Sequence, residues 1–230
     1  MLENFDFEVI ARSWRVLVFQ GLAFTLQVTV LSMLGGVILG TLLAMMRLSS
    51  IKPLSWLASG YVNLLRSVPL VLVIFWFYFL MPYIGAWIVG ASQPIRVGAF
   101  TSALVTFIFF QACYYCEIMR AGIQSIPRGQ GGAGYALGFT YWQVMRYVIL
   151  PQAFRNMLPV LLTQTVILFQ DVSLVYIISL PDLVTIASKI AQRDGRLVEM
   201  YVFVAAVYFV LCLVLSQGVK RLQARLAVGR

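Results

Sequence analysis

The sequence predicts an all-α membrane protein with about five transmembrane helices. Two observations carry this prediction. Of the 230 residues, 61% are hydrophobic and only 11% are charged, whereas a soluble domain carries about 25% charged residues. The apolar residues also form runs long enough to cross a bilayer, which takes about 20 residues in a helix. There is no internal repeat, low-complexity tract or linker, so we expect a single membrane domain.

The apolar runs predict where each element lies. Segment 1–20 is amphipathic, and we expect it to lie at the membrane surface with Trp14 and Phe19 as aromatic anchors. The transmembrane domain is expected over 21–218, followed by a basic tail, 219–230. Within it, the predicted spans are 21–46, 56–80, 95–119, 158–180 and 198–218, with a polar loop, 120–155, between the third and the fourth.

The distribution of Lys and Arg predicts the orientation. Connections on one side of the predicted spans carry basic residues without acids, and those on the other side carry both. Basic loops face the cytoplasm, so we expect a periplasmic N-terminus and a cytoplasmic C-terminus. The net charge of +9 is then explained by topology, and because no single soluble face gathers it, we expect no nucleic-acid partner.

The loop 120–155 is the one long amphipathic interruption of the apolar pattern. We expect two short helices in it, because Pro127 is typical of a helix start and Gly138 of a helix end. Thr140 and Gln143 have the spacing of a capping box at the start of the second helix. Pro151 should end that helix, since proline disfavours helical geometry in the residue before it. A surface segment of this length indicates a partner outside the bilayer.

Polar residues on the fourth predicted span form one arc. Thr163 and Gln170 nearly coincide on a helix, as do Gln164 and Asp171, because seven residues make almost two turns. A polar side chain at the centre of a bilayer is costly and usually faces a bundle interior or water. We therefore expect the arc to face a pore or a partner subunit, with hydrogen bonding inside a packed bundle as the alternative.

The second predicted span carries a second polar group. Asn63, Arg66 and Ser67 share one face just before Pro69, which removes a backbone donor. An arginine beside a helix break at membrane depth is typical of a transporter site. The alternative is an arginine that extends to the cytoplasmic headgroups.

Three further features of the spans have simpler explanations. Glu117, near the cytoplasmic end of the third span, is expected to pair with a neighbouring arginine and not with a substrate. Cys113 and Cys116 have CxxC spacing, but the chain has no second pair and no histidine, so we interpret them as packing residues. Gly36 and Gly40 match GxxxG, which more often serves packing than a specific dimer face.

Several catalytic motifs are absent from the sequence. It contains no GxxxxGK[ST] phosphate loop, no nucleophile elbow and no HExxH motif. We therefore expect no enzyme activity in this chain and no bound cofactor or metal.

The polar loop and parts of the spans resemble a known family. Gly132-Ala133-Gly134, Gly138 and Val148-Ile149-Leu150-Pro151 resemble, at the same spacing, the EAA signature of permease subunits in bacterial ABC importers. Ala133, Gly138, Leu150 and Pro151 are identical to that signature, while Gly132 replaces its glutamate, Gly134 its second alanine and Val148 an isoleucine. The stretches RAGIQSIPRGQ and LFQDVSLVYIISL resemble the polar amino acid branch, and in detail one permease of glutamate/aspartate importers.

The resemblance implies a type I ABC importer permease fold in the bacterial inner membrane. It implies three partners: a cytoplasmic dimer of ABC ATPase subunits that uses the ATP, a second homologous permease or a second copy of this chain, and a periplasmic amino-acid-binding protein. The loop 120–155 would be the coupling loop that docks on the ATPase, through Arg128, Gly132, Ala133, Gly134, Gly138, Leu150 and Pro151.

The resemblance also implies a substrate. The expected function is import of polar amino acids, L-glutamate and L-aspartate first, by alternating access, with glutamine as the alternative. Arg66 would then meet a substrate carboxylate, and Asp171 would either hold Arg66 or meet the substrate ammonium. Gln164 and Gln170 would supply neutral hydrogen bonds. Two other classes stay open, an ion-coupled secondary transporter and a membrane protein without a substrate path.

Overall fold

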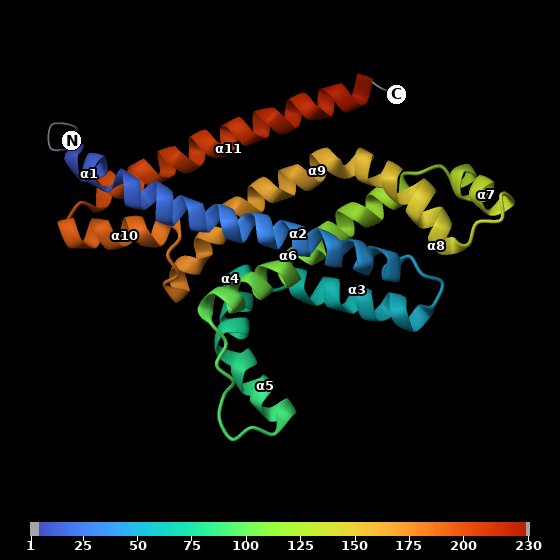
Figure 1. Ribbon diagram of the computed structural model, residues 1–230, viewed down its shortest axis with the longest axis horizontal. Coiled ribbons are helices and arrows are strands. Elements are labelled where there is room, and N and C mark those ends of the chain that lie inside the picture. Colours follow the sequence, from blue (N-terminus) through green and yellow to red (C-terminus); the bar gives the residue numbers. More distant parts are fainter. Residues whose placement is uncertain (1–4, 229–230) are drawn as a thin grey trace.

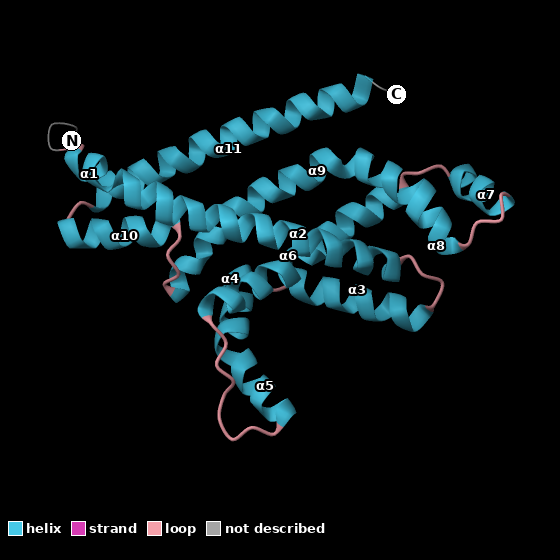
Figure 2. Ribbon diagram, viewed as in Figure 1, coloured by secondary structure: helices cyan, strands magenta, loops and turns pink. Residues whose placement is uncertain are grey.

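The computed structural model describes residues 5–228, and over these residues all regular structure is helical (Figures 1 and 2). Five of the helices are long and apolar enough to cross a membrane, which confirms the predicted fold class. In Figure 1 most helices follow the long axis, with α1 and α10 at one end and α7 and α8 at the other. We call these the α10 end and the α7 end.

The first membrane helix is longer than predicted. α1 (Glu8–Val16) continues through a π-helical turn (Leu17–Leu22) into α2 (Ala23–Arg47), without a break. The expected surface segment 1–20 is therefore, from Glu8 onward, the first part of this helix. Packing accounts for this continuity, because Val9 and Leu17 are fully buried against α10 and α11.

The predicted second span, 56–80, is wrong as a single helix. α3 (Lys52–Arg66) ends before Pro69, and a new helix starts at Leu70, made of α4 (Leu70–Phe75), a π-helical turn (Trp76–Leu80) and α5 (Met81–Val89). Pro69 has an extended backbone and no N–H to donate, so the helix cannot continue through it. α3 runs back along α2 and α4 packs on α6, whereas α5 projects from the bundle (Figure 1).

α6 (Ala99–Gln124) is the central helix, and it lies slightly C-terminal to the predicted span 95–119. Its contact with α2 is the most extensive between two helices in the described chain. At Gly40 an added Cβ would lie 2.8 Å from the carbonyl oxygen of Ala112, so only glycine permits this approach. At Gly36 an added Cβ would lie 3.0 Å from the Tyr115 ring. The GxxxG pair thus packs α2 on α6 within the chain, as expected.

The loop prediction is right in its first half. Pro127 precedes α7 (Arg128–Ala136), and Gly138 has a left-handed backbone with φ of 82°. α8 (Tyr141–Val144) opens with the predicted capping box: the Gln143 N–H donates to Thr140 Oγ1 and the Thr140 N–H donates to Gln143 Oε1.

Pro151, however, does not end the second helix. α8 passes through a π-helical turn (Met145–Ile149) into α9 (Leu150–Asp171), so that Tyr141–Ile178 is one long helical stretch. Pro151 sits in the first turn of α9, directly after the π-helical turn, where the missing N–H is tolerated. The predicted span 158–180 thus begins too late.

The chain then turns at the α10 end. A 3₁₀ helix (Val172–Ile178) follows α9, and α10 (Leu183–Asp194) is capped by buried Asp182, which accepts hydrogen bonds from the N–H groups of Val184 and Thr185. α11 (Leu197–Val228) runs back along α9. It continues beyond the predicted span 198–218, so the basic tail is helical as far as it is described.

Candidate functional site

A cavity of about 500 Å³ opens at the break between α3 and α4. Three parts of the chain that are distant in sequence line it: the break itself, the middle of α6 and the last turns of α9. Their lining residues are Arg66, Ser67, Val68, Pro69, Leu70, Phe110, Tyr114, Gln164, Ile167 and Asp171. We call it the charged cavity, because an arginine and an aspartate line the same space.

The break places Arg66 at this cavity. Arg66 is the last residue of α3, and the Ser67 hydroxyl that follows donates to the Asn63 carbonyl oxygen at 2.7 Å, which closes the final turn. The Arg66 side chain is 41% exposed, and its guanidinium lies 5.3 Å from the centroid of the Tyr114 ring. A cation above an aromatic face is favourable, so Tyr114 helps to hold the guanidinium at the cavity.

Three arginines from three helices converge on Glu117 of α6. Arg47 of α2 hydrogen-bonds Oε1 at 2.5 Å, and Arg120 of α6 contacts Oε2 through Nε at 3.0 Å and NH2 at 2.9 Å. Arg66 contacts Oε1 at 3.2 Å. The prediction that Glu117 pairs with arginine is therefore confirmed. Arg66 thus contacts this cluster and also lines the charged cavity.

Two of the four polar residues on α9 belong to the charged cavity. Gln164 lines it, and its Nε2 donates to Oε1 of buried Gln111 on α6 at 3.0 Å. Asp171 lines it seven residues further on. Over residues 5–228 the ion pair of Arg66 is with Glu117 and not with Asp171, so a role of Asp171 toward Arg66 or the substrate stays a prediction.

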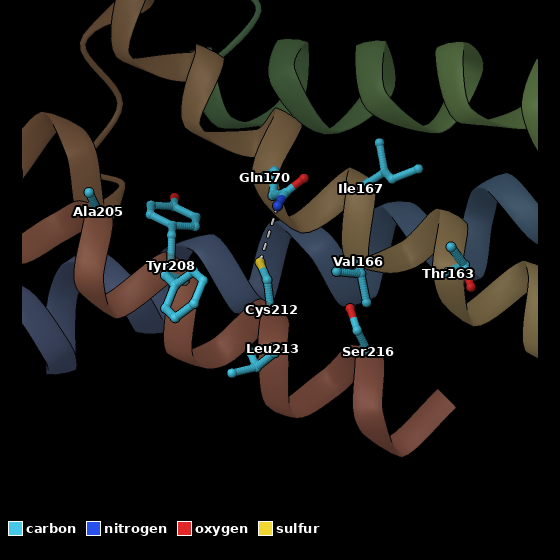
Figure 3. A pocket seen from close by; sticks show the side chains of 10 residues that line it. Thr163, Val166, Ile167, Gln170, Ala205, Tyr208, Cys212, Leu213 and Ser216 are labelled. Atoms are coloured by element: carbon cyan, nitrogen blue, oxygen red, sulfur yellow. Dashed lines mark hydrogen bonds between the residues drawn. The ribbon is translucent and has the colours of Figure 1, made fainter. Parts of the chain in front are cut away.

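The other two polar residues face elsewhere. Thr163 and Gln170 line a second cavity of about 550 Å³ between α9 and α11. Figure 3 shows Gln170 directed toward Cys212 of α11, and its Nε2 donates to the cysteine sulfur at 3.3 Å. The four residues thus line two cavities and not one, because adjacent positions are about 100° apart on the helix, enough to reach different neighbours. That the arc faces a pore or a partner subunit stays a prediction.

The structure thus brings together four of the six predicted site residues. Arg66, Ser67, Gln164 and Asp171 line the charged cavity, Asn63 reaches it only through the carbonyl that holds Ser67, and Gln170 lies outside it. Sequence reasoning missed Phe110 as a wall of the cavity, and Arg47, which it counted for orientation alone. The available signal for Arg47 was that Glu117 is an isolated acid in an apolar span, which requires nearby cations.

The loop residues occupy the α7 end. Gly134 is buried, and a Cβ there would lie 2.9 Å from Val144 Cγ2, so α7 rests closely on α8. Gly132 has open space around it and Ala133 is exposed, while Arg128 begins α7. Leu150 and Pro151 lie where α8 continues into α9.

Large apolar side chains are also exposed at this end. Tyr135 of α7, Leu137 directly after α7 and Trp142 of α8 are 51%, 76% and 64% exposed. A group of exposed apolar side chains marks a contact with another protein or with the membrane. We call these three residues the apolar loop patch.

The comparisons with known proteins are consistent with this geometry. The family described as "Binding-protein-dependent transport system inner membrane component" matches residues 36–228. A glutamate/aspartate import permease protein, GltK, of Escherichia coli O6:H1 is 50% identical over 97% of this chain and 99% of its own length. A probable glutamine ABC transporter permease protein, GlnM, of Bacillus subtilis (strain 168) is 35% identical over 90% of this chain and 91% of its own length.

Solved structures show the same fold. The structure of an amino acid ABC transporter with histidines matches with a TM-score of 0.81 and 32% identity, over 96% of this chain and 98% of the other. The MetNI methionine ABC transporter, at 21% identity and a TM-score of 0.69 over 95% of this chain and 96% of the other, supports the fold alone. The resemblance stated from the sequence is confirmed. The chain therefore belongs to the inner membrane components of binding-protein-dependent transport systems, as an amino-acid ABC importer permease.

Proposed function

We propose that this permease imports L-glutamate and L-aspartate through the charged cavity. The observation that carries the proposal is Arg66 at the wall of a 500 Å³ cavity with Asp171 in the same lining. An amino acid with an acidic side chain presents two carboxylates and one ammonium, and this lining offers a partner for each kind of charge. The 50% identity to a glutamate/aspartate import permease supports the same substrate class.

The lining suggests a role for each group. The Arg66 guanidinium suits a carboxylate, because its planar fork can donate two parallel hydrogen bonds. The Ser67 hydroxyl donates its proton to the Asn63 carbonyl, so its oxygen can only accept a hydrogen bond, for example from the substrate ammonium. The Asp171 carboxylate suits the ammonium. Gln164 donates its amide N–H to Gln111, so its own carbonyl oxygen is available to accept a hydrogen bond. Asn63 supports Ser67, and we assign Gln170 to contact with α11.

The energy for transport would come from a partner ATPase that docks at the α7 end. The apolar loop patch supports this, together with Arg128 and the signature residues Gly138, Leu150 and Pro151. Since Gly132 replaces the glutamate of the signature and is exposed, docking would depend on helix shape, on the patch and on basic residues. Closure of two ATPases would drive two permeases between inward-open and outward-open states.

The assembly we propose has the α7 end in the cytoplasm and the N-terminus in the periplasm, in the bacterial inner membrane. The basic residues of the α7 end support this orientation, because basic connections stay in the cytoplasm. A periplasmic binding protein would deliver the amino acid to the other side. The second permease is a homologous subunit or a second copy of this chain.

Uptake by the assembled importer tests the substrate proposal. An Arg66→Ala variant should lose about tenfold or more of glutamate and aspartate uptake, because a charged hydrogen-bonding pair contributes about 1.5–3 kcal/mol. Arg96→Ala, in the exposed connection before α6, is the matched control and should transport normally. Undiminished uptake by Arg66→Ala in an intact complex would overturn the role of Arg66, and import of glutamine in preference to glutamate would overturn the substrate.

Co-purification tests the docking proposal. Leu137→Asp puts a charge in the apolar loop patch and should release the ATPase from the purified permease. Ser92→Asp places the same charge in the exposed connection between α5 and α6, outside the loop 120–155, so it should leave the ATPase bound. Equal retention of the ATPase by both variants would show that the patch does not carry the contact.

A further inference from the structure

We propose that Glu117 is a built-in competitor for the substrate: it binds Arg66 when the cavity is empty and gives it up when a substrate carboxylate arrives. This rests on the proposed function, in which Arg66 meets the substrate. Glu117 would be a positioning residue, which acts through Arg66. It would set how tightly the cavity holds an anionic amino acid and how readily it releases one.

The geometry of the cluster separates Arg66 from the other two arginines. Arg120 binds Glu117 Oε2 through two nitrogens, at 2.9 and 3.0 Å, and Arg47 makes a short hydrogen bond to Oε1. Arg66 has one contact, an ion pair of 3.2 Å to an oxygen that Arg47 already occupies, and its geometry is not that of a hydrogen bond. Arg66 is therefore the most weakly held partner. Glu117 stays paired with two cations when Arg66 leaves.

Arg66 is also the member of the cluster that can reach a ligand. It lines the charged cavity and is 41% exposed, whereas Arg47 is 15% exposed and neither Arg47 nor Arg120 lines that cavity. Over residues 5–228 its only ion-pair partner is Glu117, so most of its guanidinium donors remain available. The guanidinium carbon lies over the Tyr114 ring, 5.3 Å from its centroid, and this cation–π contact uses no N–H donor, so donors remain for a second carboxylate.

The charges of the cluster favour this exchange. Three guanidinium groups surround one carboxylate, so positive charge remains in excess at the wall of the cavity. An arriving carboxylate is attracted by this excess and replaces one anion–arginine contact with another of the same kind. Because the two contacts are alike, the net gain on binding is smaller than for a free arginine. A transporter benefits from such moderate affinity, since it must release its cargo.

Two substitutions should change substrate affinity in opposite directions. Glu117→Gln keeps the shape and removes the competing charge, so the Kd for glutamate should fall about tenfold and maximal uptake should fall with it, because release slows. Arg47→Gln leaves Oε1 to Arg66 alone, so the Kd should rise about three- to tenfold. Glu117→Asp keeps the charge and should lie between wild type and Glu117→Gln. The Kd is measured with radiolabelled L-glutamate on the purified permease–ATPase complex, without the binding protein.

The control is Glu199→Gln, which removes a carboxylate paired with Arg196 in the first turn of α11, away from the charged cavity. The Kd of Glu199→Gln for glutamate should match that of the wild type. A purely structural role for Glu117 predicts weaker or unchanged binding in Glu117→Gln, and that result would overturn the inference. If Glu117→Gln does not assemble, tighter or unchanged binding in Arg47→Gln overturns it instead. Failure of the proposed function looks different, since wild type would then bind no glutamate or Arg66→Ala would bind it normally.

Discussion

The two sides of α9 line two different kinds of cavity. One side, with Gln164 and Asp171, lines the charged cavity opposite Arg66. The other, with Thr163 and Gln170, lines the cavity between α9 and α11, which contains no charged residue among its lining side chains (Figure 3). The two cavities have similar volumes, about 500 and 550 Å³, so size does not distinguish them.

Charge and partners distinguish the two sides. Asp171 has no ion-pair partner within the described chain and therefore suits a charged ligand, whereas Gln170 is already bonded to Cys212. A bundle can satisfy a neutral polar side chain by contact with the next helix, at a modest gain of about 0.6 kcal/mol per bond. A single carboxylate is much more expensive to leave at membrane depth without a function. A polar stripe on a membrane helix can therefore serve packing on one side and ligand binding on the other.

Asp171→Asn should have the largest effect on transport among substitutions of the four polar residues of α9. The amide keeps the size and loses the charge that we assign to the substrate ammonium, so glutamate uptake should fall about tenfold, or about 1.4 kcal/mol. Uptake in vesicles that contain the assembled importer measures this. Unchanged uptake would show that the carboxylate does not meet the substrate.

The sequence predicted much of this molecule because strong local signals agree with the tertiary structure. Long apolar runs specify membrane helices, and Thr140 with Gln143 formed the expected cap, since capping is a local interaction. The sequence also indicated a helix break at Pro69, but not that a separate helix begins directly after it. The residues after Pro69 form a membrane-length helix of their own, so the prediction wrongly merged the end of α3 with that helix.

The errors came from interactions that are distant in sequence. Pro151 is accommodated by a π-helical turn, which no local pattern announces. The division of α9 into two sides depends on which helices pack beside it, α6 on one side and α11 on the other. Likewise, the partner of Arg66 is Glu117 because α2, α3 and α6 meet there. Periodicity gives the face of a helix but not its neighbour.

Gln164→Leu should have an intermediate effect on glutamate uptake. It removes the neutral acceptor at the cavity and the hydrogen bond to Gln111, so glutamate uptake should fall about fivefold, as expected for one hydrogen bond of about 1 kcal/mol. Thr163→Val is the matched control on the adjacent position, because its hydroxyl bonds only the Pro159 carbonyl of its own helix, and uptake should stay within about twofold. Equal losses in both variants would contradict the separation of the two sides.

Gln170→Leu should have the smallest effect, although Gln170 is the direct neighbour of Asp171. It removes one neutral contact to the Cys212 sulfur, so the free energy of unfolding should change by less than about 1 kcal/mol, and glutamate uptake by less than about twofold. Thermal unfolding and uptake of the purified importer measure both. A loss of uptake as large as that of Asp171→Asn would mean that Gln170 also meets the substrate during transport, for example after a rotation of α9. The two cavities would then be successive parts of one path, and the division that the structure shows would hold for one state only.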